Sequence, residues 1–191
     1  MGIDFKNPFV QISTEPIRKE IGQTMIRTTR RFAVLGGLAL TLAGCANKFR
    51  TYSGPEVTRL QMFKDDRTLF LYNNSKVLKT YKFDLGFAPA GPKQFEGDGK
   101  TPEGSYTVDK RNPNSMFHLS VGISYPNEAD IAYAAAQGRS PGGDIFIHGG
   151  PRLGIDPIKP DWTAGCIAVS DREIEDIYAM VRDGTPIDIF A

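Results

Sequence analysis

Apolar and polar residues alternate along most of the chain beyond position 56, and this pattern predicts a fold built mainly from short β-strands. Polar turns separate the runs, and the turn Asn73-Asn74-Ser75 is typical of a β-hairpin. The predicted strands cover residues 57–63, 68–72, 77–83, 105–110, 116–121, 144–148, 167–169 and 186–190. The run 144–148 is almost wholly apolar, so we expect it to lie in the buried centre of the sheet.

One helix is predicted close to the C-terminus. Ser170 and Glu173 form a capping box at its start, and Gly184 marks its end. Its apolar residues fall on one face: Ile174, Ile177, Tyr178 and Val181. A second, shorter helix is predicted over residues 129–137. The fold class is therefore mainly β with one or two helices (α+β), in a single domain.

A short apolar segment near the N-terminus predicts an export signal. Arg30 and Arg31 precede an apolar run that ends in Leu42-Ala43-Gly44-Cys45, and the run is too short to cross a bilayer as a helix. The ending is similar to a bacterial lipobox, which implies that Cys45 carries a lipid and begins the mature chain. An ordinary signal peptide and a twin-arginine signal are the alternatives, and translation starts at Met1 or Met25.

These features divide the chain into an extension with a signal peptide (1–44), a tether (45–56) and a folded domain (57–191). Without the six basic and three acidic residues of the first segment, 17 Lys and Arg remain against 19 Asp and Glu. With no basic stripe, this balance argues against a nucleic-acid partner. We expect a periplasmic lipoprotein held to a membrane by its lipid, and Ala46 after the lipidated cysteine favours the outer membrane.

Cysteine and histidine usage points to nucleophilic chemistry. If Cys45 is lipidated, Cys166 is a lone thiol in an oxidising compartment, without a partner for a disulfide. His148 precedes it with 17 residues between them, and both residues adjoin glycines and strand-like runs. A neutral imidazole can accept the thiol proton, the carbonyl of Gly149 can orient the ring, and Gly165 allows backbone N–H groups to approach an oxyanion. The sequence therefore predicts acyl transfer through a thioester.

Several other interpretations compete with this one. Cys166 could be a small core residue. A zinc site would need two ligands besides Cys166 and His148, and His118 has no partner at ligand spacing, so we expect His118 to lie in a sheet. The segment Gly99-Lys100-Thr101 lies in one of two Gly- and Pro-rich loops, but it lacks the first glycine of a phosphate-binding loop.

Three sequence elements carry a resemblance to a known family. The chain has His148-Gly149-Gly150, then Thr163-Ala164-Gly165-Cys166, and upstream Thr101-Pro102-Glu103-Gly104. In this it resembles the L,D-transpeptidase catalytic domain (YkuD type), which has a histidine followed by Ser/Thr-His-Gly-Cys and an upstream Thr-Pro-x-Gly. The resemblance covers about residues 57–190. It implies a mixed β sandwich with a packed C-terminal helix, and a catalytic domain over 57–191.

The resemblance also implies a mechanism. Cys166 would be the nucleophile and His148 the base, oriented by the Gly149 carbonyl, while N–H groups around Gly165 and Cys166 would form the oxyanion hole. The substrate would be a peptidoglycan tetrapeptide stem, cleaved before its terminal D-Ala. The acyl group would pass to an amine of a neighbouring stem, giving a 3→3 crosslink, or to water, and no metal or organic cofactor is expected.

Two departures from the family pattern keep alternatives open. Ala164 stands where the family has a second histidine, and Ala168 where it often has Arg or Asn. A murein peptide hydrolase using the same Cys–His pair, and a catalytically inactive murein-binding lipoprotein, are therefore rival interpretations. The residues expected to contact substrate are Thr163, Trp162, Thr101 and Gly104. Thr163 could equally be a simple turn residue, and Trp162 could pack the loop onto the domain. Arg139 and Arg152 are candidates for contact with substrate carboxylates, or are simply surface charges.

Overall fold

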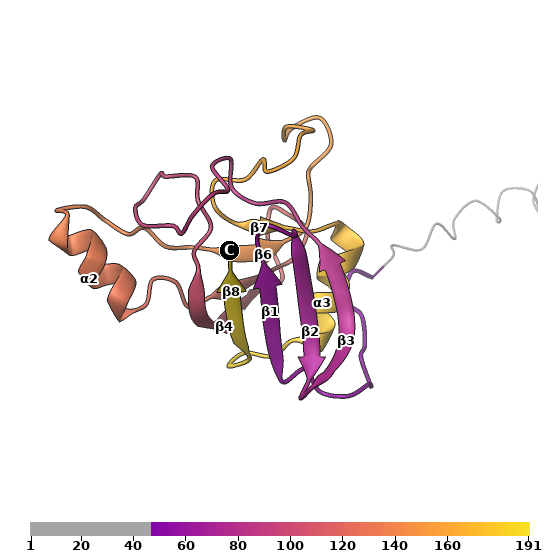
Figure 1. The fold of residues 1–191 in the computed structure, drawn as a ribbon. Helices are drawn as coiled ribbons and strands as arrows, with labels where there is room; N and C mark the ends of the chain where they lie inside the picture. Colours follow the sequence, from indigo (N-terminus) through magenta and orange to yellow (C-terminus); the bar gives the residue numbers. More distant parts are fainter. Residues whose placement is uncertain (1–46) are drawn as a thin grey trace, which may run out of the picture. The chain divides into compact units, whose positions relative to one another are not determined.

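The computed structural model describes residues 47–191, and this part of the chain folds into eight strands and two helices (Figure 1). The strands are β1 (Arg59–Phe63), β2 (Thr68–Asn73), β3 (Lys76–Lys82), β4 (Gly104–Asn112), β5 (Ser120–Ile123), β6 (Phe146–His148), β7 (Ile167–Ala168) and β8 (Pro186–Phe190). The helices are α2 (Glu128–Ala136) and α3 (Asp171–Met180). The predicted fold class is confirmed. The predicted signal peptide (1–44) and lipidation site (Cys45) lie outside the described residues.

The strands form one mixed sheet in the order β3-β2-β1-β8-β4-β5-β6-β7. Strand β4 belongs to both halves of the sheet, because residues 104–107 pair with β8 and its later residues pair with β5. The register shifts between Val108 and Lys110. An irregularity of this kind bends a strand and increases its twist, so the sheet changes direction at β4.

Strand β8 occupies the middle of the sheet although it is the last strand in the sequence. It runs parallel to β1, with Leu60 opposite Ile187, and antiparallel to β4, with Tyr106 opposite Ile187. Leu60 and Ile187 are fully buried. The pairing of β1 with β8 therefore joins two distant segments of the chain through the hydrophobic core.

Helix α3 begins as the sequence predicts. The Ser170 hydroxyl accepts the N–H of Glu173, and the Glu173 carboxylate accepts the N–H of Ser170, which completes the capping box. The helix buries Ile174, Ile177 and Met180 and contacts β5 and β6. It therefore supports the strand that ends at His148.

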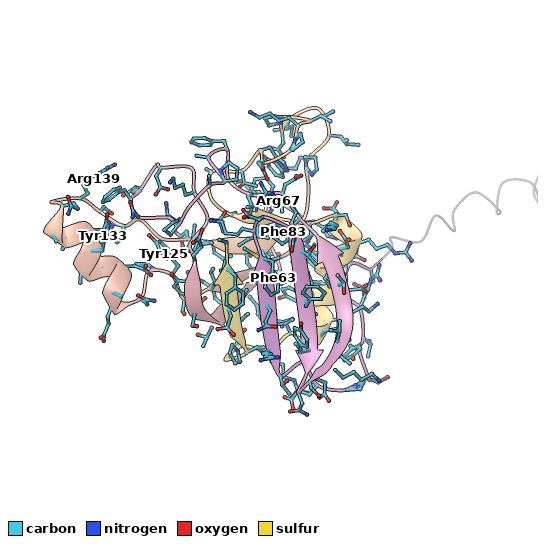
Figure 2. The ribbon with its side chains drawn as sticks, in the orientation of Figure 1. Phe63, Arg67, Phe83, Tyr125, Tyr133 and Arg139 are labelled. Atoms are coloured by element: carbon cyan, nitrogen blue, oxygen red, sulfur yellow. The ribbon has the colours of Figure 1, made fainter. Side chains whose placement is uncertain are left out.

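Helix α2 is the less buried of the two helices, and only Ala134 of its residues is buried. Ile131 and Tyr133 are about half exposed. The Tyr133 ring lies beside Phe95, and the Arg139 guanidinium lies 3.8 Å from the centroid of the Phe95 ring. Figure 2 labels Tyr133 and Arg139 at this end of the molecule. Among the described residues, no helix is long and apolar enough to span a membrane.

The two Gly- and Pro-rich loops, residues 86–104 (the first loop) and 149–163 (the second loop), meet above one end of the sheet (Figure 1). Asp84 forms a bridge with Ala168, and Gly86 forms one with Thr163. Arg67, labelled in Figure 2, holds the second loop through a salt bridge of 2.7 Å to Asp161, which also accepts the N–H of Leu85. Both loops are therefore fixed to the sheet and to each other.

The predicted strand over residues 116–121 is misplaced. Strand β5 begins only at Ser120, because His118 adopts a left-handed backbone conformation (φ 70°) that an extended strand does not accept. The His118 ring pairs with Glu175 of α3 at 2.9 Å, so the prediction of a sheet histidine is wrong. The strand predicted from Asp144 is also shorter, since Asp144 itself has φ 55°.

The described part of the predicted tether (residues 47–56) lies on the domain. Lys48 Nζ donates to the carbonyl of His118, and the Arg50 guanidinium contacts Glu175 and Asp176 of α3. The Phe49 ring lies 6.2 Å from that of Tyr178. This segment therefore binds to α3 and to the connection before β5.

Candidate active site

His148 is the last residue of β6, and its ring is fixed by the neighbouring backbone. Its Nδ1 lies 2.6 Å from the carbonyl oxygen of Gly149. A carbonyl oxygen can only accept, so Nδ1 carries the proton and Nε2 is the unprotonated nitrogen. Gly149 is closely packed, because a Cβ there would lie 2.5 Å from Asp171 Oδ1 and 2.9 Å from the carbonyl oxygen of Phe117.

Cys166 directly precedes β7, which runs parallel to β6 with Ile167 opposite Ile147 and Ala168 opposite His148. Side chains alternate between the faces of a strand, and opposed residues share a face. Cys166 lies two residues before Ala168, so its side chain is on the same face as that of His148. The two residues that the sequence singled out are thus brought together by the pairing of two short strands.

Cys166 and His148 both line two cavities. One has a volume of about 240 Å³, and its wall is formed by the segment before β5, including Met116 and Phe117. The other has a volume of about 270 Å³ and lies against the second loop, at Trp162 and Thr163. A third cavity, of about 300 Å³, contains Cys166 but not His148. Cys166 therefore borders three cavities, and His148 borders two of them.

Aromatic rings enclose the imidazole. The Phe117 ring stacks on it at a centroid distance of 4.4 Å, and the Trp162 ring meets it edge to face at 5.7 Å. Trp162, predicted to contact substrate, thus forms part of the cavity wall and also packs against the base. The sequence did not identify Phe117 as a residue of the site. Its position one residue before His118 was the only feature that could have drawn attention to it.

Burial affects both reacting groups. It lowers the pKa of His148 below its ordinary value, while the Gly149 carbonyl and Asp156 act in the opposite direction. It raises the pKa of the Cys166 thiol, and the N–H of Phe146 and the charge of Lys93 partly offset this effect. Both shifts favour the neutral thiol and the neutral imidazole over a thiolate–imidazolium pair.

Alkylation of Cys166 by iodoacetamide is accordingly expected to accelerate as the pH rises and to show no plateau near neutral pH. Only the thiolate reacts, and a raised pKa leaves less thiolate at neutral pH than in an ordinary cysteine. The lowered pKa of His148 keeps the base neutral down to a pH below 6.5, so activity should fall off only below that value. A plateau of alkylation at acidic pH would instead indicate a preformed thiolate–imidazolium pair.

Hydrogen bonds of Thr163 hold the turn before Cys166. The N–H of Gly165 donates to Thr163 Oγ1 at 3.1 Å, and the Thr163 hydroxyl donates to the carbonyl of Cys166 at 2.7 Å. The N–H of Gly165 thus has a partner within the turn. The N–H of Cys166 is the better donor for an oxyanion. Thr163 is buried and holds the turn together, although it also borders one cavity.

Two predicted substrate-binding residues are not in the cavities. Thr101 is fully buried and donates its hydroxyl to the carbonyl of Gly165 at 2.8 Å. Gly104 begins β4 opposite Ile189, and it borders none of the three cavities that contain Cys166. Thr101 and Gly104 therefore lie outside the walls of the cavities that contain Cys166.

The candidate arginines are also engaged elsewhere. Arg152 pairs with Asp156 at 2.7 Å, and this pair lowers the pKa of Asp156 to about 2. Arg139 stacks on Phe95 beyond α2. Within residues 47–191, no three His, Cys, Asp or Glu side chains gather as metal ligands would.

The chain is similar to several known proteins. YafK of Escherichia coli (strain K12), whose name marks it as a candidate L,D-transpeptidase, is 30% identical over 156 residues, covering 78% of this chain and 57% of YafK. The crystal structure of the helical cell shape determining protein Pgp2 from Campylobacter jejuni superposes with a TM-score of 0.55 at 28% identity, covering 76% of this chain and 51% of Pgp2. Bd1075 of Bdellovibrio bacteriovorus gives a TM-score of 0.50 at 26% identity, with 71% of this chain and 48% of Bd1075 covered.

The chain thus spans about half the length of these relatives. The family model for the L,D-transpeptidase catalytic domain, YkuD, matches residues 58–189, which include both Cys166 and His148. This match covers more than half of the chain and nearly all of the described domain. The chain belongs to the L,D-transpeptidase catalytic domain family.

Proposed function

We propose that this domain is a cysteine acyltransferase that acts on peptidoglycan stem peptides, as an L,D-transpeptidase. The proposal rests on one observation above all: Cys166 and His148 line the same two cavities, with Nδ1 of the imidazole held by Gly149 and Nε2 unprotonated. Family membership supports the substrate class. The description of Pgp2 as a cell-shape protein is in keeping with a role in the cell wall.

In the first half of the proposed reaction, the Cys166 sulfur attacks the carbonyl carbon of the third stem residue as His148 Nε2 takes the thiol proton. The carbonyl oxygen becomes an oxyanion, for which the N–H of Cys166 is the proposed backbone donor. The intermediate collapses, the bond to the terminal D-Ala breaks, and the imidazolium returns its proton to the leaving amine. The products are free D-Ala and a thioester.

In the second half, an amine of a neighbouring stem attacks the thioester carbonyl. His148 takes a proton from the amine, and the proton then goes to the departing sulfur, which restores the thiol. The new amide is a 3→3 crosslink. Water entering in place of the amine would give a free carboxylate and the same restored enzyme.

Hydrolysis is the second candidate function, and a specific residue favours it. Ala164 lies where the family pattern has a histidine, and it borders two of the cavities that contain Cys166. A methyl group offers no hydrogen bond to an incoming amine, so a second stem peptide loses one means of orientation there. The smaller nucleophile, water, does not need such a contact.

Incubation of the full chain with purified tetrapeptide muropeptides is expected to release D-Ala and to produce crosslinked dimers. Release of D-Ala with a tripeptide product and no dimers would establish the hydrolase in its place. Neither product, together with no mass adduct at Cys166 after treatment with a carbapenem, would indicate a murein-binding domain without catalysis.

We infer a periplasmic setting from the sequence, with the domain held to a membrane through a lipid on Cys45. The lipobox-like segment is what supports this proposal. An enzyme acting on murein stems has its substrate in the same compartment, so the proposed activity and the proposed location are consistent.

A further inference from the structure

The turn that carries the nucleophile rests on the loop that precedes β4. Thr101 is fully buried, and its hydroxyl donates to the Gly165 carbonyl at 2.8 Å across 64 positions of sequence. We propose that Thr101 is a positioning residue for acyl transfer: by holding the Gly165 carbonyl, it aims the N–H of Cys166 at the oxyanion. This inference rests on the proposed function, because it concerns the acylation of Cys166.

The planarity of the peptide unit connects the two ends of this arrangement. The carbonyl of Gly165 and the N–H of Cys166 belong to one peptide group, and in a trans peptide they point in opposite directions. A bond that holds the oxygen toward the buried Thr101 therefore directs the N–H away from the interior. Cys166 itself borders three cavities, which give a substrate carbonyl access to this residue.

Close packing leaves the turn little freedom to rotate. Gly165 has φ 130°, and a Cβ there would lie 2.6 Å from the carbonyl oxygen of Lys100. A Cβ on Gly86 would lie 2.1 Å from the carbonyl oxygen of Gly99 and 2.9 Å from Cα of Gly165. Three backbone segments thus meet here at distances that only glycine permits. The hydroxyl of Thr101 supplies the directional contact among them.

Thr101 is itself held from the sheet side. The side chain of Lys64, at the end of β1, is 1% exposed, and its Nζ donates to the Thr101 carbonyl at 3.1 Å and to Glu103 at 2.7 Å. The N–H of Lys93 donates to the same carbonyl at 3.2 Å. Buried groups with satisfied hydrogen bonds of this kind define a single arrangement. The sheet therefore fixes Thr101, and Thr101 fixes the peptide next to the sulfur.

Two reagents that react with the same sulfur can test this role. p-Nitrophenyl acetate acylates the thiol through a tetrahedral oxyanion and releases p-nitrophenolate. Iodoacetamide alkylates the thiol at a saturated carbon, releases iodide and forms no oxyanion. Both rates are followed in the full chain, with adducts assigned to Cys166 by peptide mass mapping. The ratio of acylation to alkylation then reports on the oxyanion donor and is independent of the amount of thiolate.

In Thr101→Val this ratio is expected to fall about tenfold or more, since misaligning one donor forfeits part of the 10²–10³ that such a donor contributes. Thr101→Ser keeps the hydroxyl and should restore the ratio. Thr101→Ala removes the hydroxyl with less steric change and should agree with Thr101→Val. Thr185→Val is the matched control, because Thr185 is also buried and donates to a backbone carbonyl, that of Arg182, at 2.7 Å.

The proposal is overturned if both rates fall together in Thr101→Val, which would indicate general loosening, or if the ratio stays at the wild-type value. It is also overturned if the wild-type thiol is alkylated but never acylated. Failure of the proposed function looks different: wild-type protein would leave muropeptides unchanged while the ester still acylated Cys166.

Discussion

Replacing Cys166 by serine is expected to remove acyl transfer, with turnover of muropeptides falling by about 10³-fold or more. The serine hydroxyl is far less acidic than the thiol, and the imidazole that must take its proton is itself weakened as a base, since burial lowers the pKa of His148. Turnover is measured as D-Ala released per enzyme, and the acyl-enzyme by intact mass.

The fold should survive this substitution. Cys166 is partly exposed, and serine differs from cysteine only by a smaller atom at the γ position. The Tm of Cys166→Ser is therefore expected within about 2 °C of the wild-type value. A variant that stays folded and still forms products at the wild-type rate would remove Cys166 from the mechanism altogether.

Replacing His148 by asparagine is expected to lower turnover by about 10²- to 10⁴-fold, the range for loss of a general base. The asparagine amide can still donate to the Gly149 carbonyl, which accepts from Nδ1 in the wild type. It cannot provide the unprotonated Nε2. KM is expected to change little, because the walls formed by Phe117 and Trp162 remain in place.

His118→Asn is the matched control, since His118 is the chain's other histidine. Its backbone is left-handed (φ 70°), a conformation that asparagine tolerates well. Its ring contacts Glu175, which Arg50 continues to neutralise in the variant. We expect turnover within about threefold of wild type, well below the loss for a general base. An equal loss in both variants would mean that His148 acts through folding and not through proton transfer.

Local patterns in the sequence were sufficient for much of the fold. The hairpin of β2 and β3 follows from alternation on either side of an Asn-rich turn, and its residues pair close in sequence. The capping box of Ser170 and Glu173 likewise needs only residues three apart. Local sequence also identified His148 and Cys166 as candidate catalytic residues, since each lies among glycines at the edge of an apolar run.

Contacts between distant residues could not be predicted in this way. Thr101 was assigned to the substrate, and only the folded chain places it 2.8 Å from the carbonyl of Gly165. No sequence pattern indicated that Lys64 is buried or that Arg67 pairs with Asp161. A charged residue in a polar turn is ordinarily solvated. Phe117 was missed because the left-handed backbone of His118 moves the start of β5.

The position of β8 has a consequence for how the polypeptide is made. Its five residues, Pro186–Phe190, lie between β1 and β4, yet the ribosome synthesises them after every other strand described here. A nascent chain that ends before them has two separate half-sheets with unpaired inner edges. The two half-sheets can therefore join only after residues 186–190 have been synthesised.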